Sequence, residues 1–384
     1  MQNGRKRTII AGYFVLLTLV SSHAYFYSLY DMDMMGYIGN AAAISGASIG
    51  QIHDEAYRAL EAEAPEMVKG HILGTDVPAS QLDSRQDRAV NPLHFAEYLP
   101  CFAIRPIFNE LVYLLHYKAG IGLIRATIVI SVVSYWLTGA LLFMWLVRYT
   151  GVGRAALAAF LLMLAPPILD LARFNTPDSL SCLVCLAALY LIFERNSMFL
   201  GLTLLLVSIY VRTDNVLLAV GVLAYCAFIT GQLEKMKVAV LGAVAVASVA
   251  AINHFAGDYG IRLLYYRSFV AVPLAPGELV AQFGLPEYVQ AFRTAIAETV
   301  NSSFPLFLLM GLIGFFSRRN RVTQAIAVVT AFYTCAHFFL FPSGQERFWG
   351  PFYLACGMTM VIAAFSRDAQ ERCPANSVGC VAID

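Results

Sequence analysis

Two aspartates, Asp31 and Asp33, follow directly after the first long apolar run of the chain, in the segment YDMDMMGYIGNAA. Tyr37 and Ala41 follow Asp33 in steps of four residues, the spacing that places side chains on one helix face. A carboxylate beside apolar surface can accept the proton of a hydroxyl that attacks an electrophile. The same positions also suit a helix start, where Asp31 would cap the first turn and Asp33 would stabilise its positive end. The sequence leaves catalysis and capping open for this pair.

Arginines with acidic neighbours stand at the ends of further apolar runs. They are Arg173 and Asp178 in DLARFNTPDSL, Arg212 and Asp214 in YVRTDNVLL, and Arg347 after Glu346 in PSGQERFWGP. A guanidinium group is a rigid fork of donors that suits phosphate oxygens. Each arginine could instead form a structural ion pair with its acidic neighbour. For the three arginines together we expect at least one phosphate contact.

The histidines and cysteines carry weaker signals. His94, in NPLHFAEY, could donate to a phosphate or help to hold a metal, although a solvated loop histidine is the more frequent case. No HxxxH or HExxH pattern occurs, and the need for Mg²⁺ or Mn²⁺ stays open. Cys182 and Cys185 form a CxxC inside an apolar run, where thiols behave as small hydrophobes and zinc would lack two ligands.

The composition places these groups in a membrane protein. Of 384 residues 59% are hydrophobic and 13% are charged, whereas soluble domains have about 25% charged residues. The formal net charge of +1 lacks the basic excess typical of nucleic-acid binding. A soluble enzyme and a nucleic-acid partner are therefore excluded, and membrane lipids are the expected surroundings.

Apolar runs without Asp, Glu, Lys or Arg must position the charged groups. The first run, residues 8–30, follows the basic MQNGRKR and is too long for a signal-peptide core of about 7–15 residues, so it predicts a retained span. Nine further runs occur at 126–147, 155–169, 179–193, 197–211, 215–233, 238–256, 299–317, 322–345 and 350–366. Since about twenty apolar residues cross a bilayer, we expect an all-α polytopic membrane protein with about ten transmembrane helices.

Lys and Arg residues in short loops predict the orientation, because they stay on the cytoplasmic side. With the N-terminus inside, ten crossings place on that side Arg5, Lys6, Arg7, Arg148, Arg154, Arg195, Lys235, Lys237, Arg318, Arg319, Arg321, Arg367 and Arg372. The short outer loops then hold only Arg173, Arg212 and Arg347. All the charged clusters fall on the outer face, and we expect a bacterial inner membrane with the site facing the periplasm or exterior.

Two long outer segments, residues 31–125 and 257–298, have the mixed apolar and polar character of amphipathic helices that lie along the membrane surface. The polar stretch 51–91 inside the first has no assigned role. Residues 367–384 are expected to form a short cytoplasmic tail. No internal repeat or soluble-domain linker is evident, so residues 1–384 are treated as a single integral-membrane domain.

In the order of its motifs and in topology, the sequence resembles the GT-C class of integral-membrane glycosyltransferases. The bacterial protein mannosyltransferase and lipid A aminoarabinose transferase group is the most similar. The likeness rests on a DxD-like Asp31-Met32-Asp33 followed by Tyr37, the loop from Arg173 to Asp178, Arg212-Thr213-Asp214-Asn215, and Arg347 before the last run. It extends over most of the chain.

The resemblance implies transfer of a sugar from a polyprenyl-phosphate or diphosphate donor to a lipid, glycan or protein acceptor of the cell envelope. It implies that Asp33 or Asp31 is the general base or positions the acceptor, and that Arg212 and Arg347 bind the donor phosphate. A direct displacement would invert the anomeric carbon. The expected substrate-binding residues are Arg173, Asp178, Arg212, Asp214, Arg347, Tyr37 and His94.

Two other functions remain open from the sequence. A transporter or flippase of a charged solute or lipid-linked sugar could place charged residues at span ends, and a structural subunit could use them to pair spans. Transporters often show two related halves and broken helices near the midplane, and neither is apparent here. The gathering of the charged motifs on one face favours one-sided chemistry.

Overall fold

The computed structural model describes residues 2–75, 79–273, 276, 283–317 and 321–365. These residues are almost entirely helical, and the described ranges contain no strand beyond an isolated parallel bridge between Leu29 and Phe174. The predicted tail 367–384, with Arg367 and Arg372, lies outside the described residues, as do Arg318 and Arg319.

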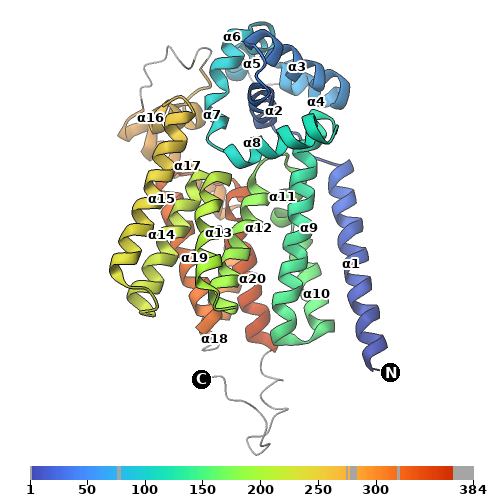
Figure 1. Ribbon diagram of the computed structural model, residues 1–384, viewed down its shortest axis with the longest axis vertical. Coiled ribbons are helices and arrows are strands. Elements are labelled where there is room, and N and C mark those ends of the chain that lie inside the picture. The colour runs from blue at the N-terminus through green and yellow to red at the C-terminus, as the bar shows by residue number, and fades with distance from the viewer. Residues whose placement is uncertain (1, 76–78, 274–275, 277–282, 318–320, 366–384) are drawn as a thin grey trace, which may run out of the picture.

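The larger part of the molecule is a bundle of apolar helices (Figure 1). Its helices are α1 (Gln2–Phe26), α9 (Leu123–Thr150), α10 (Val152–Met163), α11 (Pro166–Arg173), α12 (Asp178–Leu189), α13 (Met198–Val211), α14 (Val216–Ala224), α15 (Lys235–Phe255), α18 (Phe304–Ser317), α19 (Arg321–Leu340) and α20 (Gly350–Phe365). Short π-helical turns extend α12 (Tyr190–Glu194) and α14 (Tyr225–Ile229). Each of the ten apolar runs falls largely within these helices, as the absence of charge predicts.

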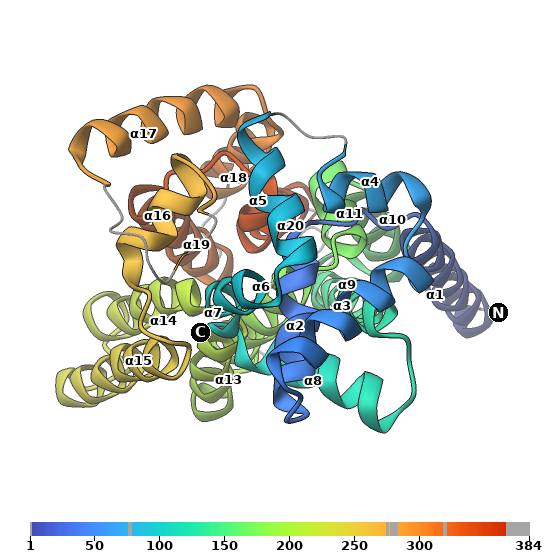
Figure 2. The same ribbon diagram turned by 90° about the horizontal axis from the view of Figure 1, so that it is seen from above.

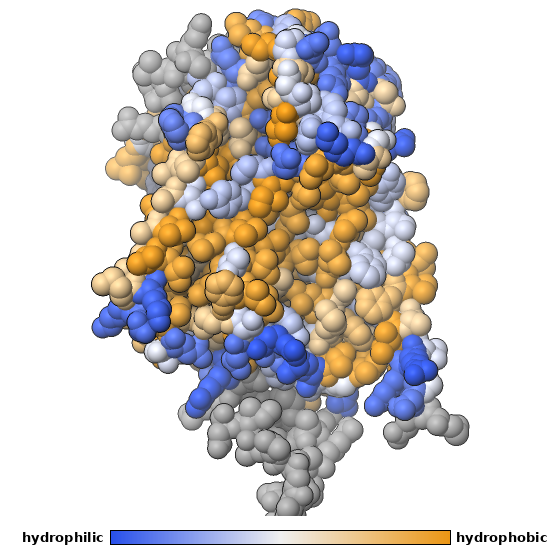
Figure 3. Space-filling model, in the orientation of Figure 1, coloured by the Kyte–Doolittle hydropathy of each residue, from blue (hydrophilic) through white to orange (hydrophobic). Residues whose placement is uncertain are grey.

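Five described helices are long and apolar enough to cross a membrane, and up to seven spans result if each bent pair is one span. The bent pairs are α10 with α11, at 68°, and α17 (Leu285–Val300) with α18, at 70°. On the face shown in Figure 3, apolar side chains form a broad band across the middle of the molecule, with hydrophilic side chains above and below it. The expectation of an all-α protein with several candidate membrane spans is confirmed for the described residues, whereas the count of ten spans stays a prediction.

The first long predicted loop folds into a compact helical cap over one end of the bundle. The cap contains α2 (Asp33–Ile44), α3 (Ile49–Glu63), α4 (Glu66–Leu73), α5 (Ala79–Val90), α6 (Pro92–Tyr98), α7 (Pro100–Ala103), α8 (Pro106–Tyr113) and a π-turn (Leu114–Lys118). Viewed from above, α2, α5 and α6 lie over the bundle, with α16 (Gly260–Phe269) beside them (Figure 2).

The cap has an apolar core that is distinct from the main core of the bundle and includes the first turns of α9. Helix α2 is buried from Met34 to Ala42 inside the cap, so it does not have the half-exposed face of an amphipathic interfacial helix. The cause is local: Gly36 and Gly39 have no Cβ, so Phe102 and Leu99 pack directly on the α2 backbone. This packing fixes the helix that begins at Asp33.

Candidate functional site

A cavity of about 350 Å³ lies between the cap, α16 and the end of the bundle, within the usual size range of small-molecule sites. Its charged lining residues come from distant parts of the chain and are Asp31, Asp33, Arg85, Arg88, Arg105, Asp178, Arg212, Arg267 and Arg347. Six arginines face three aspartates, so the lining has a formal excess of three positive charges. The cavity therefore suits an anionic ligand.

The acidic pair stands at the junction of α1 and the cap. The Asp31 amide donates to the Asn175 side-chain oxygen at 3.0 Å, and Asp31 Oδ1 accepts from the Asp33 amide at 2.9 Å. Asp31 thus satisfies one of the free amides at the start of α2, although Met32 and not Asp31 is the residue that directly precedes this helix. Both carboxyl groups keep about a fifth of their surface exposed, at 23% for Asp31 and 21% for Asp33. Capping and a role in the cavity are compatible for this pair.

Two guanidinium groups hold the pair. Arg347, in the short helical turn Glu346–Trp349, donates from Nη1 to Asp31 Oδ2 at 2.8 Å and from Nη2 to Asp33 Oδ2 at 3.3 Å. Arg267 of α16 donates from Nη2 to Asp33 Oδ1 at 3.4 Å and to the Tyr98 hydroxyl at 2.8 Å. Asp31 is held by short contacts, whereas both contacts to the Asp33 oxygens are long and weak.

The environment separates the proton affinities of the two carboxyl groups. Burial and the neighbouring charge of Asp33 raise the pKa of Asp31 above its ordinary value, although Arg347 opposes this shift. Burial also acts to raise the pKa of Asp33, but Arg347, Arg267 and Arg105 together outweigh burial and hold that pKa below its ordinary value. Unlike proton affinities in adjacent carboxyl groups are typical of acid–base sites.

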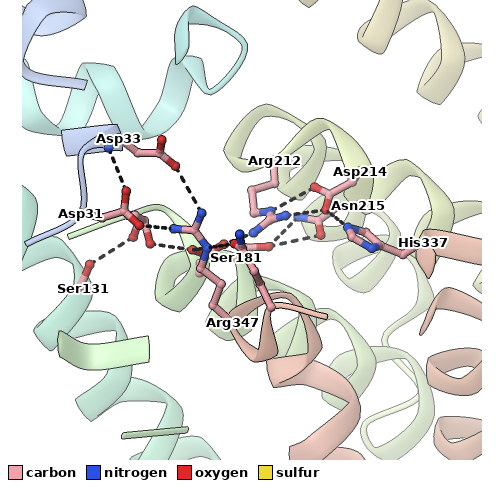
Figure 4. Close-up of polar contacts among 12 residues, drawn as sticks. Asp31, Asp33, Ser131, Ser181, Arg212, Asp214, Asn215, His337 and Arg347 are labelled. Atoms are coloured by element: carbon pink, nitrogen blue, oxygen red, sulfur yellow. Dashed lines mark hydrogen bonds and ion pairs between the residues drawn. The ribbon is translucent and has the colours of Figure 1, made fainter. Parts of the chain in front are cut away.

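From Arg347 a chain of alternating charges continues into the bundle (Figure 4). Arg347 Nε lies 4.0 Å from Asp178 Oδ2, and Asp178 pairs closely with Arg212. Arg212 makes a two-pronged contact with Asp214, at 3.0 Å from Nε and 2.6 Å from Nη2. His337 of α19 ends the chain, with Nε2 2.9 Å from Asp214 Oδ2. Each charge in the chain is therefore compensated by a neighbour, as buried charges require.

Helix breaks place this chain at the end of the bundle. Helix α13 ends at Val211, and Arg212 adopts an extended backbone conformation before the turn Thr213–Asn215 begins. The buried Asn215 amide donates to Ser181 Oγ at 2.8 Å and to the Ser208 carbonyl at 2.9 Å. These bonds satisfy polar groups that the break exposes and fix the direction of the Arg212 side chain.

Most residues that the sequence singled out meet in the cavity, but not all of them. Its lining includes Asp31, Asp33, Tyr37, Asp178, Arg212 and Arg347, and Asp214 lies directly behind Arg212. Arg173 pairs instead with Asp170 at 3.0 Å and donates to the Tyr27 carbonyl. His94 contacts Asp87 at 2.5 Å. Neither Arg173 nor His94 lines the cavity.

Several lining residues were not found from the sequence. Arg267 lies in IRLLYYRSF, where aromatic and basic residues predicted only membrane-surface anchoring. Arg85 and Arg88 lie in the polar stretch without an assigned role, and no motif marks them. His337 does not line the cavity, but it ends the chain of charges, and no sequence motif marks it.

A metal centre finds no support among the described residues. Within them, no group of three or more His, Cys, Asp or Glu side chains is placed to hold a metal ion. The acidic pair has guanidinium groups as its neighbours instead. Cys182 and Cys185 are both buried free thiols in α12.

Comparisons with family models, with curated proteins and with solved structures found no significant match for this chain. The resemblance of its motifs to GT-C glycosyltransferases stays a prediction. Function must therefore be inferred from the cavity itself, its carboxylate pair, its positive charge and its position at the end of an apolar bundle.

Proposed function

We propose that the protein is an integral-membrane glycosyltransferase that moves a sugar from a polyprenyl-phosphate or diphosphate donor to an envelope acceptor. One observation carries the proposal: a carboxylate pair and a positively charged cavity meet at one end of an apolar helix bundle. A donor with a long lipid tail can approach such a site through the bilayer, while an acceptor arrives from the water or from the same leaflet.

The proposed topology has ten crossings in a GT-C-like arrangement. Beyond the five long helices and the two bent pairs, each counted as one span, three shorter apolar segments contribute crossings: α12 with its π-turn, α13, and Thr213–Ile229. The N-terminal end of α1, with Arg5, Lys6 and Arg7, lies at the end of the bundle away from the cap (Figure 1). By the positive-inside rule that end is cytoplasmic, so the cavity faces the periplasm or exterior of a bacterial inner membrane.

The proposed chemistry is one displacement at the anomeric carbon. The acceptor hydroxyl oxygen attacks that carbon, the bond from the carbon to the phosphate oxygen breaks, and the bonding electrons leave with the phosphate. Asp33 takes the hydroxyl proton, because its two oxygens accept only the long contacts from Arg347 and Arg267. Arg347 stabilises the negative charge that develops on the leaving phosphate. The product anomer is inverted.

Arg347 is better placed than Arg212 for the phosphate. Its long contact to Asp33 can be exchanged for a phosphate oxygen, whereas Arg212 is held by Asp178 and Asp214 and is only 8% exposed in its side chain. When a phosphate draws Arg347 away from Asp33, that carboxylate loses part of its compensation and becomes a stronger base. Donor binding would thus increase the basicity of Asp33.

The test is release of polyprenyl phosphate or diphosphate from a panel of lipid-linked sugars by the purified protein in liposomes, with envelope extract as acceptor. Asp33→Asn is expected to lower the turnover rate about 10²- to 10⁴-fold, the usual contribution of a general base. Asp54→Asn, at an exposed carboxylate of the cap, is the matched control and should keep full turnover.

Three outcomes would contradict the proposal or part of it. Turnover retained in both Asp33→Asn and Asp31→Asn would remove the acidic pair from the reaction. No turnover of any donor by the wild-type protein would favour a transporter or flippase. Retention of the anomer in an NMR spectrum of the product would exclude the single displacement.

A further inference from the structure

Arg88, one of the arginines that line the cavity, has hydrogen-bond donors from which no protein group accepts. Arg88 of α5 is 1% exposed, yet its Nε and Nη1 atoms have no hydrogen-bond partner. Its guanidinium carbon lies 4.2 Å from the centre of the Tyr98 ring, and both residues line the cavity. A buried guanidinium group with unused donors is costly, and an anion that entered the cavity would remove this cost.

Arg267 joins Arg88 at the same aromatic ring. Its guanidinium carbon lies 4.8 Å from the centre of the Tyr98 ring, and Nη2 donates to the Tyr98 hydroxyl and to Asp33. Its Nε atom is buried and has no hydrogen-bond partner. Tyr98 and Arg267 thus connect the surroundings of Arg88 directly to the acidic pair.

Arg85 adds a third positive charge to this wall. It stands three residues before Arg88 on α5, which is the spacing of neighbours on one helix face, and it also lines the cavity. Its Nη1 donates to the His71 carbonyl at 2.5 Å. Burial and the nearby charge of Arg88 lower the pKa of Arg85, although Tyr98 and Asp31 oppose this shift.

We propose that Arg88, together with Arg85 and Arg267, forms a second anion subsite that binds a phosphate-type oxyanion. The proposal rests on the proposed function, because it adds a second charged group to the reactants of that transfer. The oxyanion is either the second phosphate of a diphosphate donor or a phosphate group on the acceptor. Both sources offer pairs of phosphate oxygens, which the planar guanidinium fork of arginine binds with two parallel hydrogen bonds.

A first experiment tests the subsite without any transfer reaction. Binding of inorganic pyrophosphate and inorganic phosphate to the full chain in nanodiscs is measured by calorimetry at constant ionic strength. Arg88→Met is expected to weaken pyrophosphate binding about tenfold to a hundredfold. Arg58→Met removes the same charge from an exposed position of the cap and should leave binding unchanged. Wild-type affinity in Arg88→Met would overturn the proposal.

Unfolding temperatures without anion separate binding from a structural role. If Arg88 only packs against Tyr98, then Arg88→Met lowers the unfolding temperature and Arg88→Lys binds pyrophosphate like the wild type; that result also overturns the proposal. A ligand role predicts an unchanged or higher unfolding temperature for Arg88→Met and weakened binding in Arg88→Lys, because lysine keeps the charge but loses the fork.

A second experiment distinguishes the two sources. Polyprenyl diphosphate and polyprenyl monophosphate are compared in liposomes. If the subsite takes the second donor phosphate, the wild-type protein prefers the diphosphate and Arg88→Met loses that preference. If the subsite binds a phosphate group of the acceptor, the wild-type protein has similar affinities for the two lipids. Arg88→Met then weakens pyrophosphate binding even when the monophosphate lipid is bound. Pyrophosphate binding that depends on Arg88 would stand even if no sugar transfer were found, so the two proposals fail separately.

Discussion

The two walls of the cavity differ in how the positive charges of their arginines are compensated. On the bundle-side wall, formed by Asp178, Arg212 and Arg347, each guanidinium group lies against carboxylates. On the cap-side wall, formed by Arg85, Arg88, Tyr98 and Arg267, Arg267 contacts Asp33, but two donors of Arg88 have no hydrogen-bond partner and its guanidinium group lies over the Tyr98 ring. Charges compensated within the protein hold helices together, whereas a charge left uncompensated is one that a ligand can complete.

The largest expected effect is in the bundle-side wall. Arg212→Leu would take from Asp178 and Asp214 the guanidinium group that both contact, and breaking a buried pair in this way costs about 3–5 kcal/mol of folding free energy. We expect a large fall in the unfolding temperature of the purified protein in detergent. Arg88→Met is the matched change in the cap-side wall and should cause no fall; a similar loss in both variants would remove the difference between the walls.

A smaller effect is expected where the cap holds the acidic pair. A Cβ at position 36 would overlap the Phe102 ring, so Gly36→Ala should lower the free energy of unfolding by about 1–3 kcal/mol and shift α2, which carries Asp33. Gly12→Ala in α1 is the control, because nothing lies within 4 Å of its Cβ, and alanine there should stabilise the helix slightly. Chemical denaturation of both variants would measure the contrast, and equal changes would contradict it.

The acidic pair at the junction of the walls predicts a pH dependence. Because the pKa of Asp31 is raised, Asp31 becomes protonated above the pH where an ordinary aspartate would, and it then loses its ionic contact with Arg347. Ionised Asp31 holds Arg347, which we propose stabilises the leaving phosphate, so the transfer rate should rise with pH as Asp31 ionises. Asp31→Asn should remove this rise from the pH–rate profile.

The stability effect of Asp31 has the opposite sign. A raised pKa in the folded state means that protonated Asp31 favours folding at low pH, and this contribution is lost as pH rises through the raised value. Asp31→Asn, which resembles the neutral form, should leave the unfolding temperature at pH 7 unchanged or higher. A clear fall would assign Asp31 a structural charge. Asp54→Asn should change neither the profile nor the stability.

Much of the bundle could be predicted from the sequence, because uncharged apolar runs have few alternatives to helices in a membrane. The common location of Asp31, Asp178, Arg212 and Arg347 also follows from their places at run ends. Their pairing could not be predicted, since each arginine has an acidic neighbour in the sequence and the contact from Arg347 to Asp31 joins residues 316 positions apart. Only the fold decides between these partners.

The cap-side wall could not be predicted from the sequence either, but for a different reason. Arg88 lies in a helix whose polar residues resemble those of any exposed helix, and only the fold shows that this residue is 1% exposed. The buried position of α2 depends on Phe102, a residue more than sixty positions later in the chain. Local patterns do not encode such contacts.

The smallest effect is expected at Arg173, which does not line the cavity. Arg173 stands at the same end of the bundle as Arg347, but its partly exposed pair with Asp170 resembles a surface salt bridge, which contributes about 0–1 kcal/mol. Arg173→Ala should therefore change the unfolding temperature little and leave donor affinity within about twofold, whereas Arg347→Ala should weaken donor binding strongly. Donor titration of both variants in liposomes would measure this. A tenfold loss in Arg173→Ala would place Arg173 on the path of the donor, and the walls would then not be the only charged surface that the donor meets.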